Sequence, residues 1–296
     1  MVFNPTTDIP DLAGKYILIT GGTAGIGKES VRALAKHNPE CIYFTGRDSK
    51  RADEIIAETK SSKVVFLECD LTSLASVQAM AQKVISETDR LDVLMCNAGV
   101  MNVAPALTKD GFEVHFGINH MAPLLIKLLL PTLLRTAEAP GSDVRIVSLS
   151  SQGFVTHPGG GIIFKDLKTT QGSGIVQAQR YGQSKLANLL YAVELARRYP
   201  QITSVSIHPG VVRTGLVSGQ GMFSKALIYI TNPLSTMTPV DGARNQLWVA
   251  TADKQSIING EYYEPVGKRG KHARKSRDVA LAGKLWDWTE NELGSF

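Results

Sequence analysis

Cysteine is scarce, with only Cys41, Cys69 and Cys96 among 296 residues. Each lies in or beside an apolar, strand-like run, which predicts buried thiols. Their spacing fits neither a disulfide framework nor a metal site, so we expect no metal. Buried, unpaired thiols are typical of a reducing compartment, and we therefore expect a cytoplasmic protein.

Long apolar runs are also lacking. The longest stretch, Leu124 to Leu134, contains Lys127 and Pro131 and is too short to cross a bilayer. The first eight residues are polar and interrupted by Pro5, unlike a secretory signal peptide. The sequence therefore predicts no transmembrane segment.

An excess of acidic residues is absent too, and the net charge is +5. Much of the basic excess lies between Lys268 and Arg277. No aromatic side chains that could stack on bases alternate with these cations, so we expect no nucleic acid as a partner. We interpret the run as a solvated loop and helix entrance, with contact to an anionic membrane or an acidic substrate group as the alternative.

What the chain does contain is an alternation of short apolar runs with longer helical patterns. This predicts an α/β fold, a doubly wound sheet of about seven mostly parallel strands with helices on both faces, in a single domain over 1–296. The predicted strands are 16–19, 41–45, 64–67, 91–96, 144–149, 202–207 and one near 258–263. The predicted helices are 26–36, 48–60, 73–87, 112–134 and 178–198, with a C-terminal helical tail at 278–293.

Two segments interrupt this alternation. Residues 153–174 are rich in glycine, threonine and proline, which predicts a long loop. Residues 214–238 combine glycine and proline with large apolar side chains such as Met222, Phe223 and Tyr229. We interpret 214–238 as a mobile lid over a hydrophobic ligand, and the alternative is an ordinary buried helix with flanking turns.

A glycine cluster follows the first predicted strand and opens a helix. Gly21 permits a tight turn, Gly25 lets backbone amides approach a pyrophosphate, and Gly27 lets the helix pack close to the strand. The N-terminus of the helix then offers free N–H groups and a partial positive charge to the anion. This context predicts dinucleotide binding rather than a plain surface turn.

The end of the second predicted strand indicates which nicotinamide cofactor fits. An acidic residue there would bind the ribose hydroxyls of NAD, but the chain reads Thr45, Gly46, Arg47. A guanidinium at this place can hold a 2′-phosphate in a bidentate manner and stack on adenine. We therefore predict NADP(H), with NAD as the alternative because Asp48 could neutralise Arg47.

Tyr181 and Lys185 are four residues apart on the predicted helix 178–198. At this spacing the two side chains lie one above the other on one face. An ammonium beside a phenol favours the phenolate, so the phenol becomes a better acid near neutral pH. Without further context, the pair would instead indicate a half-buried amphipathic tyrosine and a surface lysine.

Together with further motifs in the same order, these residues resemble the short-chain dehydrogenase/reductase family over nearly the whole length. Residues 20–27 resemble its TGxxxGxG loop, residues 97–99 its NAG turn, and residues 209–214 its PGxxxT motif. The resemblance implies a Rossmann fold and a catalytic tetrad of Asn119, Ser151, Tyr181 and Lys185. It implies that the cofactor is bound by Gly21, Thr23, Gly25, Ile26, Gly27, Arg47, Asp70, Leu71, Asn97, Ala98, Gly99, Tyr181, Lys185, Pro209, Gly210, Val212 and Thr214.

The resemblance also implies hydride transfer between nicotinamide and a carbonyl carbon. Tyr181 would then donate a proton, and Lys185 would lower the pKa of the phenol and hold the nicotinamide ribose. Ser151 would bind the carbonyl oxygen, although Ser150 competes for this role. Asn119 would hold a water that links Lys185 to solvent, unless it is a helix-interior amide bonded to its own backbone.

Three other basic side chains near these motifs have weaker claims to a role. In the family motifs that contain His120 and His208, histidine does not carry the proton, so we expect structural histidines. Lys127 could face either cofactor or solvent.

Within the family, the chain is most similar to the retinol-dehydrogenase-like branch, on residues 97–101, 110–120 and 280–293. Membrane-bound members of that branch carry a hydrophobic N-terminal anchor that we do not see in this sequence, so a retinoid substrate is not assumed. Residues 152–180 and the segment after Thr214 are expected to form the walls of the substrate cleft. Their apolar side chains favour a lipophilic ketone or aldehyde, or the matching alcohol.

We therefore predict an NADP(H)-dependent oxidoreductase in which Tyr181 is the general acid/base. One alternative is a cofactor-assisted isomerase, dehydratase or cyclase on the same scaffold. Another is an NADP(H)-sensing interaction protein, which is disfavoured because such proteins commonly lose the tyrosine or lysine that is present here. A homodimer is possible, since members of the family often pair through their two long helices.

Overall fold

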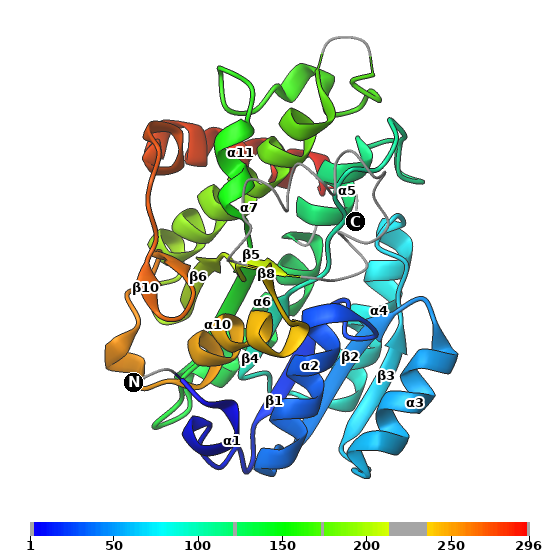
Figure 1. Cartoon of the computed structure of the whole chain (residues 1–296), viewed down its shortest axis with the longest axis vertical. Coiled ribbons are helices and arrows are strands. Elements are labelled where there is room, and N and C mark those ends of the chain that lie inside the picture. Colours follow the sequence, from blue (N-terminus) through cyan, green and yellow to red (C-terminus); the bar gives the residue numbers. More distant parts are fainter. Residues whose placement is uncertain (1–2, 121–122, 173–174, 213–235, 295–296) are drawn as a thin grey trace.

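The computed structural model describes residues 3–120, 123–172, 175–212 and 236–294. Figure 1 shows its central sheet with helices packed on both sides. The strands of this sheet lie in the order β10-β9-β6-β5-β4-β1-β2-β3. Their bounds are β1 Tyr16–Ile19, β2 Cys41–Gly46, β3 Val64–Glu68, β4 Val93–Cys96, β5 Arg145–Leu149, β6 Thr203–Ile207, β9 Tyr262–Glu264 and β10 Lys268–Arg269.

Neighbouring strands from β3 to β9 pair in parallel, and only β10 runs antiparallel to its neighbour. The predicted doubly wound α/β fold is therefore confirmed. The additional edge strand β10 is two residues long and basic, so its sequence has no apolar pattern that could indicate a strand. A separate two-stranded ladder joins β7, Val211–Val212, to β8, Thr236–Met237.

The helices form two layers because successive side chains of each buried strand point to opposite faces of the sheet. On β1, Leu18 belongs to one apolar core, whereas Ile17 and Ile19 belong to the other. The Leu18 side is covered by α4 (Leu74–Glu87), α6 (Pro123–Glu138), α7 (Gln177–Arg198) and α11 (Val279–Glu292). The opposite side is covered by α2 (Gly25–Leu34), α3 (Ser49–Thr59) and α10 (Pro239–Thr251), with the short α1 (Pro5–Asp8) beside α10.

The helix α11 lies within the predicted tail 278–293 and packs along α7. The rings of Tyr191 and Trp286 are stacked at 4.8 Å between centroids, and the Arg198 guanidinium lies 4.5 Å from the centroid of Trp286. Lys127 is oriented towards this helix, not towards the cavity described below. Its Nζ donates to the carbonyl of Leu293 at 3.3 Å.

The predicted helix 112–134 corresponds to α5, Val114–His120, and α6, which continues past Pro131 to Glu138. By length and composition alone, Val114–Glu138 could cross a membrane, with a mean hydropathy of 1.4, but 62% of that window is buried inside the protein. A core helix passes the same test, so this is weak evidence for a membrane span.

The remaining segments differ from the sequence prediction in detail. The predicted loop 153–174 contains two short 3₁₀ turns, Gln152–Thr156 and Phe164–Asp166. The predicted lid 214–238 lies outside the described residues except for its last three. The basic residues Lys268, Arg269, Lys271, Arg274 and Arg277 are exposed, and Arg269 pairs with Glu261.

Candidate active site

A cavity of about 730 Å³ lies at the carboxyl ends of the parallel strands. Its lining residues follow β1, β2, β3, β4, β5 and β6. The strand order reverses between β1 and β4. From β1 the chain proceeds to β2 and β3 on one side, and from β4 it proceeds to β5 and β6 on the other. Ligands of open α/β sheets bind at such a switch point.

The glycine loop between β1 and α2 has the backbone shape that a bound phosphate requires. Gly25 has a φ of 55°, a left-handed conformation that side chains disfavour. A Cβ on Gly27 would stand 2.3 Å from the carbonyl oxygen of Gly21, so only glycine fits. The loop therefore fits a dinucleotide pyrophosphate against the N-terminus of α2, which begins at Gly25.

The turn after β4 holds this loop in place. The Asn97 amide donates to the carbonyl of Thr20 at 2.8 Å, and the Ala98 N–H donates to the Thr20 hydroxyl at 3.1 Å. Asn97 is 8% exposed, so its side chain mainly supports the loop, while Ala98 and Gly99 line the cavity beside it.

Arg47 follows β2 and is an exposed lining residue at one end of the cavity. The alternative that Asp48 neutralises Arg47 finds no support among the described contacts. Asp48 caps α3 by accepting from the Arg51 N–H at 3.1 Å, and its carboxylate pairs with the Arg51 guanidinium at 3.2 Å. The described contacts of the Asp48 carboxylate are therefore with Arg51 of α3 and not with Arg47.

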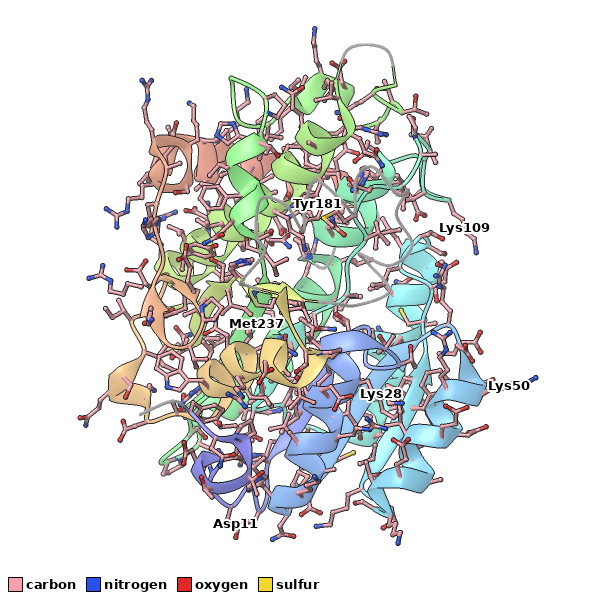
Figure 2. The ribbon with its side chains drawn as sticks, viewed as in Figure 1. Asp11, Lys28, Lys50, Lys109, Tyr181 and Met237 are labelled. Atoms are coloured by element: carbon pink, nitrogen blue, oxygen red, sulfur yellow. The ribbon has the colours of Figure 1, made fainter. Side chains whose placement is uncertain are left out.

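Asp70 and Leu71 line the same end after β3. The Asp70 carboxylate pairs with Lys109 Nζ at 2.9 Å and accepts from the N–H and the hydroxyl of Thr72. Partial burial would raise the pKa of Asp70, but Lys109 and Thr72 together hold it at about 2. Figure 2 shows Lys109 at the edge of the molecule, far from Tyr181 near its centre.

Tyr181, Ser151 and Lys185 meet at the other end of the cavity. The Ser151 hydroxyl lies close enough to the Tyr181 phenol to lower its pKa, and Lys185 Nζ lies 5.8 Å from the centroid of the Tyr181 ring. The helix α7 supplies both the phenol and the ammonium, and the segment after β5 supplies the serine. These three groups can therefore act on one bound molecule.

The two adjacent serines have different surroundings. The Ser150 hydroxyl is buried and donates to the backbone carbonyl of Lys185 at 2.7 Å, which ties β5 to α7. The Ser151 hydroxyl is half-buried, accepts from the Gly153 N–H at 3.0 Å and contacts Tyr181. Of the pair, only Ser151 has its hydroxyl beside the phenol.

The ionisation of the tyrosine–lysine pair is dominated by burial. Burial raises the pKa of the Tyr181 phenol, and the hydrogen bond with Ser151 opposes this rise. Burial also lowers the pKa of Lys185 to about 8. Burial therefore dominates the pKa of the phenol, and the lowering of that pKa by Lys185 stays a prediction.

Asn119 lies behind the cavity wall, on α5. Its Oδ1 accepts from the Val100 N–H at 2.6 Å, and its Nδ2 donates to the Val100 carbonyl at 3.0 Å and to the Ser184 hydroxyl at 2.9 Å. The side chain does not bond its own helix backbone, so it differs from the helix-interior alternative. Asn119 holds the segment after β4 against α7.

Two of the histidines near the site, His120 and His208, are buried and uncharged at neutral pH. Burial lowers the pKa of His120 to about 4, although a hydrogen bond with Asn188 opposes this. Burial likewise lowers the pKa of His208 to about 4. His208 lines the cavity, whereas His120 packs against Phe116 and Tyr191.

The cavity brings together most of the residues that the sequence suggests. Gly27 and Asn119 lie outside its lining, and Thr214 lies outside the described residues. Sequence reasoning missed several lining residues. They are Ala24, Thr45, Gly46, Cys69, Thr72, Val100, Met101, Asn102, Ile118, Leu149, His208 and Val211. Gln152, Gly153, Thr156 and Ala178 also line the cavity, as expected for the predicted wall 152–180.

A phosphate loop at one end and a tyrosine–lysine pair at the other define a nicotinamide-dependent oxidoreductase. Residues 15–222 match the short chain dehydrogenase family. The chain belongs to this family.

Its relatives include an uncharacterised oxidoreductase of Schizosaccharomyces pombe, 37% identical over 294 residues that cover 95% of this chain and 86% of the relative. Mouse retinol dehydrogenase 12 is 35% identical, with 98% of this chain and 89% of the relative covered. The crystal structure of NADPH-bound carbonyl reductase from chicken fatty liver has a TM-score of 0.68 at 25% identity and covers 92% of this chain and 99% of its own. The similarity to the retinol-dehydrogenase-like branch is thus confirmed.

Proposed function

We propose that this protein is an NADP(H)-dependent reductase or dehydrogenase of lipophilic ketones, aldehydes or the matching alcohols, with Tyr181 as general acid/base. The observation that carries the proposal is the contact of the Tyr181 phenol with Ser151 in the wall of the cavity that also contains the phosphate loop. NADPH-bound carbonyl reductase has the same fold.

When bound, the nicotinamide supplies or accepts the hydride. In the reducing direction Tyr181 gives its proton to the oxygen that becomes a hydroxyl, and Ser151 donates a hydrogen bond to the same oxygen. The raised pKa of Tyr181 keeps the phenol protonated before this transfer. Lys185 would hold the ribose of the bound cofactor and stabilise the developing phenolate, a role that the family resemblance supports.

The preference for NADP(H) is supported by Arg47, which is exposed at the end of β2 and has no acidic neighbour among its described contacts. A free guanidinium there favours a 2′-phosphate over a bare ribose hydroxyl.

A lipophilic substrate is supported by the charge of the lining. Among the described lining residues, the charged side chains are Arg47, Asp70 and Lys185, and Arg47 and Asp70 lie at the end away from Tyr181. The lining also includes the apolar side chains of Val100, Met101 and Ile118. Among the described lining residues, Lys185 is the charged group at the Tyr181 end, and the mechanism above assigns it to the cofactor and the phenol, which favours an uncharged substrate.

Two finer proposals complete this description. The buried free thiols Cys41, Cys69 and Cys96 support a cytoplasmic location. A homodimer through the long helices would need a face of α6 and α7 that α11 leaves open, since α11 packs along α7.

The test is the absorbance of NADPH in the presence of a panel of ketones, aldehydes and quinones of increasing apolar size. We expect turnover that rises with apolar size and is slower with NADH. Turnover confined to small charged sugars or hydroxy acids would refute the lipophilic part. NADPH binding without oxidation across the panel would refute the reductase.

A further inference from the structure

One buried side chain beside the site has no role in the mechanism above. Asn188 lies on α7, three residues beyond Lys185, and is 7% exposed. Its Nδ2 donates to two backbone carbonyls, that of Asn119 at 3.0 Å and that of Leu149 at 2.9 Å. The amide therefore bridges α5 to the end of β5.

The carbonyl of Leu149 is also the acceptor for Lys185. Lys185 Nζ donates to it at 2.9 Å, and Lys185 is 5% exposed. The ammonium and the Asn188 amide thus share one carbonyl oxygen. Any shift of that carbonyl would move the ammonium relative to Tyr181.

The two carbonyls determine how the Asn188 amide is oriented, and His120 contacts its remaining polar atom. Because Nδ2 gives its protons to the two carbonyls, Oδ1 must be the atom that faces His120 Nδ1, at 3.1 Å. His120 Nδ1 then carries the proton, and the neutral ring of a histidine with a pKa of about 4 suits this assignment. Both protons of Nδ2 and one lone pair of Oδ1 thus have partners, so the Asn188 amide has one orientation.

The Asn188 contact also changes the expected role of Asn119. The backbone carbonyl of Asn119 is bonded by a protein amide. Asn119 was expected to hold a water that links Lys185 to solvent, but one lone pair of its carbonyl already has a partner. The space behind it, lined by Asn119, His120, Asn188, Ser148 and Cys96, has a volume of about 10 Å³. That volume is close to the smallest that admits one water.

We propose that Asn188, oriented by the carbonyls of Asn119 and Leu149, is a positioning residue for Lys185, because it fixes the Leu149 carbonyl that anchors the ammonium. The inference rests on the proposed function only in assigning Lys185 to the reaction. The contacts themselves do not depend on the substrate.

Few charged groups surround Lys185. The pKa of Lys185 should therefore depend on the position of the Leu149 carbonyl that Asn188 holds. The titratable groups that face it or the space behind it are uncharged at neutral pH, since burial raises the pKa values of the phenols and the thiol and lowers those of the histidines. These groups are Tyr181 and Tyr191 on α7, Cys96 on β4, His120 on α5 and His208 after β6. Asp70, at the far end of the cavity, is ionised.

The experiment compares Asn188→Ala and Asn188→Leu in the full chain. Asn188→Ala opens room for water next to Lys185, and Asn188→Leu removes the amide but fills the space. We expect both to lower kcat for carbonyl reduction about tenfold, the factor that one lost buried hydrogen-bond partner gives. Only Asn188→Ala should move the alkaline limb of the pH profile upward, because hydration restores the ammonium.

Asn259→Ala is the matched control. Asn259 also joins backbone groups through its amide, by accepting from Ser204 N–H and donating to the Ile202 carbonyl, and it lies at the opposite end of β6 from the cavity. We expect this variant to keep the kcat and the alkaline limb of the wild type. If both Asn188 variants fold and also keep the kcat and the alkaline limb of the wild type, the proposal is wrong.

A second readout separates this proposal from the proposed function. NADPH affinity, followed by cofactor fluorescence across pH, reports Lys185 without any substrate. If the wild type reduces no carbonyl, but Asn188→Ala still moves the pH dependence of NADPH binding, the reductase fails and the positioning role stands. If NADPH binding by Asn188→Ala has the same pH dependence as in the wild type, the positioning role is wrong, whether or not the enzyme reduces a carbonyl.

Discussion

Arg47 and Lys185 are cations at opposite ends of one cavity, in opposite surroundings. Arg47 is exposed to solvent, whereas Lys185 is 5% exposed and is held by a backbone carbonyl. Water and salt screen the first charge, and loss of hydration weakens the second. The exposed end is therefore suited to recognise a cofactor, and the buried end is suited to change protonation. Mutations at the two ends should differ in size and in kind.

The largest effect is expected at the buried end. Tyr181→Phe removes the proton donor but keeps the ring, so kcat should fall by about 10²–10⁴ while NADPH affinity stays close to that of the wild type. Steady-state turnover and cofactor fluorescence measure the two quantities. Tyr199→Phe, at the far end of α7, is the control and should be active. A Tyr181→Phe variant with wild-type kcat would contradict the assignment.

An intermediate effect is expected at the exposed end. Arg47→Ala should weaken NADPH binding about tenfold and leave NADH binding nearly unchanged, since a charge-assisted hydrogen bond to the 2′-phosphate is lost. The control is Arg51→Ala, because Arg51 already pairs with Asp48. Titration with both cofactors at two salt concentrations measures the effect. An equal loss of affinity for NADPH and NADH would show that Arg47 does not bind the 2′-phosphate.

The pH dependence distinguishes the two ends in another way. With the pKa of Lys185 lowered to about 8, its ammonium is present below that pH and is lost above it. We expect kcat/KM for NADPH-dependent reduction to fall about tenfold per pH unit above pH 8. The raised pKa of Tyr181 excludes the phenol as the source of that limb.

Lys185→Arg provides the control for this limb, because a guanidinium does not titrate in this range. The kcat/KM that the Lys185→Arg variant retains should therefore not change between pH 8 and 10. A wild-type limb that appears only near pH 10 would mean that burial does not depress the pKa of Lys185.

The smallest effect is expected at Lys109, whose side chain is 67% exposed and pairs with Asp70. An exposed ion pair contributes about 0–1 kcal/mol, so Lys109→Ala should change NADPH affinity by a few-fold at most, and less at high salt. The pKa of Asp70 should rise from about 2, because a cation is removed. Isothermal titration at two salt concentrations checks the affinity, and NMR titration checks the carboxyl.

The parts of the molecule that the sequence predicts well are those that local pattern determines. Buried parallel strands read as short apolar runs, and the glycine loop is recognised because Gly27 lies too close to Gly21 for any side chain. The tyrosine–lysine spacing correctly places both groups on one helix face. It does not reveal how deeply they are buried, and therefore does not reveal that burial raises the pKa of Tyr181.

The parts that escape the sequence depend on contacts between distant segments. Asn188 reaches Asn119 on another helix and Leu149 at a strand end. Lys109 reaches Asp70 from another loop. A side-chain amide or ammonium has many possible partners along the chain, and only the folded backbone selects among them. β10 escapes for a different reason, since two basic residues do not form a strand pattern.

The packing of α11 on α7 has a consequence for how the chain acquires its structure. Tyr191 stacks on Trp286, a residue synthesised after β6, β9 and α10. Contacts between segments so far apart in the chain form late, because the intervening loop must close first. During biosynthesis, the side of α7 that contains Tyr191 is therefore exposed to solvent until α11 has been made. We expect chaperones to bind the nascent chain at this apolar surface, or the chain to aggregate through it.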